Sequence, residues 1–163
     1  MHQLLRRALG SARPDSVHRA HQVLEERYRE LAASGDFTAQ LEQIYHAGQL
    51  DPAAAAREWV ATMDQCLAVG RYDRCRALIT LLADLPTDAA TQGRFTYRIA
   101  QADIGLGRWA DAEALVDSMP AGSPHATLMR ANLAFCRGDF AHAEELATTA
   151  LGQASPARAS RPG

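Results

Sequence analysis

The sequence predicts an all-α fold built from about four antiparallel helix hairpins, and three observations predict it. Glycine recurs at positions 35, 70, 107 and 138, so the intervals are 35, 37 and 31 residues. The last three glycines open related segments, "GRYDRCRAL", "GRWADAEAL" and "GDFAHAEEL", in which an aromatic, a small residue and a leucine recur at fixed offsets. The chain is also rich in alanine and has few β-branched runs, a composition that favours helices. A period in the mid-thirties is typical of arrays of helical repeats.

Apolar spacing and capping residues place eight helices in order along the chain. The expected helices span about 15–33, 37–47, 52–68, 71–83, 87–106, 109–118, 124–137 and 140–151. They pair into hairpins over about 15–48, 51–85, 87–119 and 123–151, with "GQLDP" and "MPAGSP" as turns. Asp36, Asp51 and Asp139 are expected N-caps, and Ser123 precedes a proline at the first helical position.

Each recurring residue has a physical role in such a hairpin. The glycine adopts the left-handed conformation that ends a helix. The aromatic two positions later is expected to pack back on the helix just completed; these residues are Phe37, Tyr72, Trp109 and Phe140. The small residue, at Cys75, Ala112 and Ala143, allows two helix axes to approach closely. The first hairpin departs from this pattern because Gln40 stands at the small position.

The two ends of the chain lack the repeat. We expect residues 1–14, "MHQLLRRALGSARP", to be the remnant of a preceding domain or an arginine-bearing targeting segment. We expect residues 152–163, rich in Pro, Ser, Ala and Arg, to be a disordered tail. The repeat domain is therefore assigned to residues 15–151.

Composition excludes several classes of function. All 17 basic residues are arginine, so no lysine is present for a Walker A loop or for Schiff-base chemistry. The net charge of −2 and the lack of a basic face give no reason to expect nucleic acid. No stretch approaches a membrane span, and the three separated cysteines fit reduced thiols in the cytoplasm. We find no catalytic constellation and expect no cofactor.

The Gly–x–aromatic–x–x–Ala order, the period, and prolines that end hairpins (Pro86 and Pro120) resemble tetratricopeptide repeats over about residues 52–151. Ala100 and Ala131, seven residues before their glycines, match the small position of the first helix in each repeat, whereas Met63 departs from it. The resemblance implies a right-handed α-solenoid whose first helices line a concave groove for a peptide or protein. It also argues against a receptor for C-terminal tails, because Ala61, Arg98 and Met129 stand where a carboxylate clamp needs other side chains.

By that resemblance, three sets of residues are candidates for the partner-binding groove. They are Arg57, Val60 and Asp64; Arg94, Tyr97 and Gln101; and His125, Leu128 and Asn132. The members of each set share a helix face because they are three or four residues apart. On the same helix, Phe95 and Ile99 are assigned to the core.

A second resemblance covers residues 17–86, where "VHRAHQVLEERY", "LEQIYHAGQLDP" and "RYDRCRALI" are similar to the segment that follows the ATPase and winged-helix modules of large signal-transducing ATPases. It implies a bacterial cytoplasmic protein that serves as a sensor or partner-binding arm. The function expected from both resemblances is a non-catalytic protein–protein interaction module.

Two alternatives remain open at this stage. His18 and His21 lie one turn apart and could bind a metal together with His46, which would make the chain a small metal protein or enzyme. Alanine-rich terminal hairpins without polar caps could instead stack on copies of themselves, giving a homo-oligomeric scaffold. Cys66 and Cys75, on either side of the Gly70 turn, are interpreted as two small core residues rather than a redox pair.

Overall fold

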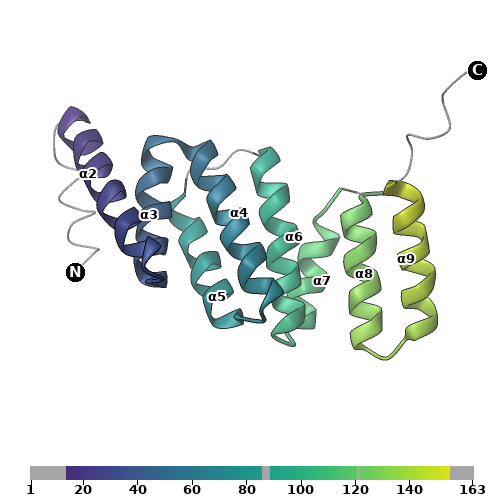
Figure 1. Ribbon diagram of the computed structural model, residues 1–163. Coiled ribbons are helices and arrows are strands. Elements are labelled where there is room, and N and C mark those ends of the chain that lie inside the picture. Colours follow the sequence, from purple (N-terminus) through teal and green to yellow (C-terminus); the bar gives the residue numbers. More distant parts are fainter. Residues whose placement is uncertain (1–13, 86–88, 121, 155–163) are drawn as a thin grey trace, which may run out of the picture. The chain divides into compact units, whose positions relative to one another are not determined.

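The computed structural model describes residues 14–85, 89–120 and 122–154, and within these ranges the regular structure is entirely helical. The α-helices are α2 (Pro14–Ala33), α3 (Phe37–Leu50), α4 (Pro52–Ala68), α5 (Tyr72–Leu81), α6 (Ala89–Gly105), α7 (Trp109–Asp117), α8 (Pro124–Cys136) and α9 (Phe140–Ala154), with a 3₁₀ turn η1 (Leu82–Asp84) (Figure 1). The prediction of an all-α fold is confirmed.

The helix starts follow from the residues that precede them. The Asp36 carboxylate accepts hydrogen bonds from the backbone amides of Thr38 and Ala39, and Asp139 accepts one from His142. Asp51 accepts from the amide of Ala54 before Pro52 opens α4. Each of these bonds satisfies an amide that the first turn of a helix leaves without a carbonyl. Ser123 is the N-cap residue before Pro124, as predicted, although its side chain makes no capping bond.

The glycine turns form as the sequence predicts. Gly35, Gly70, Gly107 and Gly138 all have positive φ, between 69° and 91°. After Gly107 the amide of Arg108 donates 2.8 Å back to the carbonyl of Asp103, which ties off the end of α6. This left-handed closure is the reason glycine recurs at these positions.

The helix ends differ from the predictions in three places. Helix α3 continues through the buried Gly48 to Leu50, beyond the turn expected at "GQL". Helix α5 ends at Leu81 and η1 follows, so the expected single helix is split. Helix α9 extends to Ala154, which makes residues 152–154 helical instead of part of a tail. The expected start of α6 at 87–88, residues 1–13 and residues 155–163 lie outside the described residues.

By its internal contacts the chain divides into two compact units, which cut across the predicted repeat domain. Unit 1 comprises residues 1–63 and 76–88, and unit 2 comprises residues 64–75 and 89–163. In unit 1, α2 packs along α3. In unit 2, α6 packs on α7 and α8 packs on α9, while α8 also contacts α6 and α7.

The core of unit 1 centres on a tryptophan. Trp59 is fully buried, and its indole N–H donates 2.9 Å to the backbone carbonyl of Leu78, so its one polar atom is satisfied. Ile44, Met63 and Leu78 are also fully buried. The interior of this unit also holds five polar or charged side chains, those of His21, Glu25, Gln43, His46 and Thr62.

The core of unit 2 consists mainly of small residues. Ala100, Ala112, Val116, Ala126, Met129 and Leu133 form one buried cluster, against which Tyr97, Ile104, Leu115 and Met119 pack. Cys75, Ala112 and Ala143 are buried, as their role as small contact residues predicts. Phe95 is fully buried, which confirms its assignment to the core.

Two of the recurring aromatics are less buried than we expected. Trp109 is 39% exposed and Phe140 is 62% exposed. Phe140 does lie against the helix just completed, with its ring 5.3 Å from that of Phe135 in an edge-to-face arrangement, but both rings remain largely in solvent. The main buried tryptophan is therefore Trp59, a residue outside the repeat motif.

Among the described helices, none has both the length and the apolar character that crossing a membrane requires.

Candidate functional site: an open pocket on helices α6 and α8

One hollow in unit 2 lies on the face formed by α6, the end of α7 and the start of α8. It has a volume of about 710 Å³ and is open to solvent. Helix α6 contributes residues between Gln92 and Arg98, and α8 contributes His125. The segment that joins α7 to α8 supplies Ser118, Met119 and Pro120.

The floor of this pocket continues the core of unit 2. Tyr97, Leu115 and Met119 line the pocket and also pack against the buried cluster that contains Met129. The ring of Tyr97 meets the ring of His125 edge to face, with centroids 4.8 Å apart. Burial raises the pKa of the Tyr97 phenol, so the ring presents a neutral hydroxyl. A ligand would thus meet an apolar surface already fixed by packing.

The pocket carries basic side chains and, among its described lining residues, no acidic ones. The basic residues are Arg94, Arg98 and His125. Arg98 makes a two-pronged ion pair with Asp64, with both nitrogen–oxygen distances at 2.7 Å. The guanidinium of exposed Arg94 has no hydrogen-bond or ion-pair partner among the described residues. The charge of Arg98 is thus already paired, whereas the guanidinium of Arg94 is available for a ligand.

The structure brings together some of the residues predicted to form the groove. Arg94, Tyr97 and His125 share the pocket on α6 and α8. Gln101 and Asn132 line a smaller recess together with Leu67, Tyr72 and Ile104. The carboxylate of Asp64 is occupied by Arg98, so it is less suited to hold a partner than the sequence suggested.

The remaining candidates do not join the pocket. Arg57 lies in unit 1 and is exposed, and half-buried Val60 is in the same unit. Leu128 is 38% exposed on α8.

Sequence reasoning missed the role of Arg98 in this site. It treated Arg98 only as a departure from a carboxylate clamp, whereas the side chain lines the pocket and holds Asp64. A signal was available, because Asp64 and Arg98 carry opposite charges and lie 34 residues apart, close to one repeat period. Leu115 and Met119 were also missed, since nothing in their local sequence marks a pocket floor.

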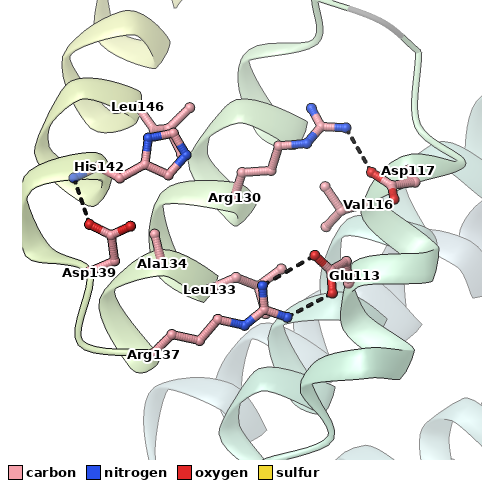
Figure 2. A pocket seen from close by; sticks show the side chains of 10 residues that line it. All are labelled: Glu113, Val116, Asp117, Arg130, Leu133, Ala134, Arg137, Asp139, His142 and Leu146. Carbon is pink, nitrogen blue, oxygen red and sulfur yellow. Dashed lines mark hydrogen bonds and ion pairs between the residues drawn. The ribbon is translucent and has the colours of Figure 1, made fainter.

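A second, smaller pocket of about 190 Å³ lies among α7, α8 and α9 (Figure 2). Its charges neutralise one another: Arg137 binds Glu113 with nitrogen–oxygen distances of 3.2 and 2.7 Å, and Arg130 binds Asp117 at 3.1 Å. The ion pair with Arg137 lowers the pKa of Glu113. These pairs join α7 to α8 and its C-terminal end, and they leave the pocket without an uncompensated arginine. This arrangement is typical of a structural contact between helices.

The histidines weighed as metal ligands are only partly brought together. In unit 1 the Nδ1 atoms of His21 and His46 lie 2.8 Å apart, and both rings are buried. Tyr28 stacks on His46 with ring centroids 5.7 Å apart. His18 remains exposed and contacts Gln22. Within the described part of the chain, no group of three or more His, Cys, Asp or Glu side chains is arranged to hold a metal ion.

The Nδ1–Nδ1 contact needs one proton between the two rings, so one imidazole donates and the other accepts. Burial and the neighbouring His18 lower the pKa of His21, which favours this neutral pair. The pair therefore acts as a polar core contact between α2 and α3.

The two cysteines beside the Gly70 turn are free, buried thiols. Burial raises the pKa of Cys66 and raises that of Cys75 to about 11. A thiol with a raised pKa is mostly protonated at neutral pH and is a poor nucleophile. This chemistry favours the interpretation of both residues as core positions.

Comparisons of the chain with protein-family models, with curated proteins and with solved structures found no significant match.

Proposed function

We propose that this chain is a non-catalytic protein-interaction module that holds an extended peptide segment of a partner in the pocket on α6 and α8. The single observation that carries the proposal is the composition of that pocket. A floor packed on the core lies beside an exposed arginine that has no partner among the described residues. Apolar pockets with a few well-placed polar groups are the usual form of a binding site.

The energetics of interfaces support this choice of surface. Tyrosine and arginine are the residue types that most often dominate binding energy, particularly where a rim excludes water around them. Tyr97 supplies a ring that is already fixed by packing, so binding does not have to immobilise it. The pocket among α7, α8 and α9 offers less, because binding there would first have to break existing ion pairs.

We also propose that the hairpins form a right-handed solenoid of tetratricopeptide-like repeats. Four positive-φ glycines at the predicted turns and buried small residues at the predicted contact positions support this arrangement. A role as a cytoplasmic sensor arm in bacterial signalling belongs to the same proposal and rests on the resemblance alone.

The test is a selection of short random peptides displayed on phage against the purified full chain. We expect enriched peptides whose binding is weakened more than tenfold by the double change Arg94→Ala/His125→Ala. The matched control is Arg76→Ala/His142→Ala, which removes the same residue types from exposed positions outside the pocket. Both double variants should melt like the parent protein, because all four side chains are exposed.

Two outcomes would overturn the proposal. In the first, no peptide is enriched over an unrelated helical protein. In the second, the enriched peptides bind the Arg94→Ala/His125→Ala variant as tightly as the parent. If the chain also sediments as an oligomer that the peptides do not dissociate, the alternative of a self-associating scaffold replaces it.

A further inference from the structure

The charge of the α6–α8 pocket identifies the chemistry of its ligand. The whole chain has a net charge of −2, so a patch of exposed residues should on average include carboxylates. The described lining of this pocket contains two arginines and a histidine but no acid. Only Arg98 has its charge compensated, by Asp64. The pocket is thus locally basic on an acidic protein.

We propose that the pocket binds an acidic segment of a partner protein, with an aspartate or glutamate side chain on Arg94 and an adjacent apolar side chain on the floor of Tyr97, Leu115 and Met119. This inference rests on the proposed function, since it names the chemical class of the peptide. A carboxylate and a guanidinium form a charge-assisted hydrogen bond that is stronger than a bond between neutral groups. Arg94 lines the same pocket as the apolar floor, which allows both contacts to be made by one peptide segment.

The geometry favours the side chain of an internal acidic residue over a C-terminal carboxylate. Capture of a chain terminus needs several donors that converge on one carboxylate. Here Nε and Nη2 of Arg98 each donate a hydrogen bond of 2.7 Å to a carboxylate oxygen of Asp64. Another nitrogen of Arg98 donates to the backbone carbonyl of Arg94 at 3.2 Å. That leaves Arg94 as the one described arginine of the pocket whose guanidinium is available for a ligand.

The experiment uses three fluorescein-labelled peptides with amidated C-termini and identical apolar residues. Their polar positions carry Glu in the first peptide, Gln in the second and Arg in the third. Fluorescence polarisation at physiological ionic strength, where distant charges are screened, measures the affinity of each for the full chain. We expect the Glu peptide to bind at least tenfold more tightly than the Gln peptide, and the Arg peptide to bind least.

Charge reversal provides a test that loss of folding cannot imitate. Arg94→Glu should abolish the preference for the Glu peptide and bind the Arg peptide more tightly than the parent protein does. Arg76→Glu is the matched control, because it changes the net charge equally at an exposed position outside the pocket. It should leave the order of the three peptides unchanged.

The inference is overturned if the Glu and Gln peptides bind equally, if none of the three binds, or if Arg94→Glu and Arg76→Glu alter the preference to the same extent. These results are separable from failure of the proposed function. Phage-selected peptides that lack acidic residues but still lose affinity with Arg94→Ala/His125→Ala would leave the proposed function intact and refute only the acidic chemistry.

Discussion

The two units of this chain solve the same packing problem with different chemistry. Unit 1 buries five polar or charged side chains, whereas the buried polar residues described in unit 2 are Asp103 and Thr127. In unit 1 the polar groups satisfy one another: the Gln43 amide donates to Glu58 at 3.0 Å, and Arg29 binds Glu25 at 2.7 Å. In unit 2 alanines make up much of the buried contact surface between helices, as in the cluster around Ala112.

This difference between the two cores shows which kind of contact a repeat pattern in the sequence can predict. An apolar contact between small residues needs only the right size at the right position, which the sequence displays directly. A buried polar contact needs a specific partner, which can lie far along the chain. Glu25 and Gln43, for example, are 18 residues apart. This is a physical reason for the poor fit of the first hairpin to the repeat.

The largest expected effect distinguishes the buried tryptophan of unit 1 from the motif tryptophan of unit 2. Trp59→Ala removes a fully buried ring and its hydrogen bond to Leu78, so we expect a loss of about 3–5 kcal/mol in the free energy of unfolding. Trp109→Ala, at a residue 39% exposed, should cost about 1 kcal/mol. Urea denaturation of both variants measures the difference. Equal losses would mean that the motif tryptophan is as deeply packed as Trp59.

The next largest effect on stability is expected from placing a larger side chain in the small-residue core of unit 2. Ala112 is fully buried, and leucine there should destabilise the protein by about 1–3 kcal/mol because neighbouring helices must move apart. Ala114→Leu is the matched control on the same helix, at an exposed position, and should change stability by less than about 0.5 kcal/mol. Thermal melting compares the two. A neutral Ala112→Leu would contradict the close helix approach that the repeat assignment requires.

A smaller effect concerns pH and the polar core of unit 1. Burial holds the pKa of His21 below 6.5, so as pH falls through 6.5 the unfolded chain takes up a proton that the folded chain does not. Stability from this residue is therefore complete above that pH and is lost as pH falls towards the folded-state pKa, by at most about 1.4 kcal/mol per pH unit.

Melting temperatures at about pH 7.5 and about pH 5.5 measure this loss. His21→Gln removes the titrating group and should reduce the difference between the two temperatures. His142→Gln removes an exposed histidine of unit 2 and should leave it unchanged. Equal behaviour of the two variants would show that the His21–His46 contact does not couple folding to protons.

The sequence predicted what depends on local chemistry and missed what depends on distant contacts. The glycine turns, the aspartate caps and the start of α4 at Pro52 are properties of a few adjacent residues, and all were predicted. The extra turn of α3 was missed because a glycine normally suggests a helix end, whereas Gly48 is a buried residue inside the helix. In the candidate site, helix periodicity placed Arg94 and Tyr97 on one face. The role of Arg98 depends on Asp64, which lies on another helix.

Under the proposed function, the pocket on α6 and α8 is the surface that binds the partner. The most direct measurement is a map of amide ¹H–¹⁵N chemical shifts of the full chain as a selected peptide is titrated in. We expect the largest shifts to cluster at Arg94, Tyr97, Ser118 and His125, which line the pocket. The largest shifts at Glu113, Arg137 and His142, around the pocket of Figure 2, or at residues of α2 and α3, would contradict it.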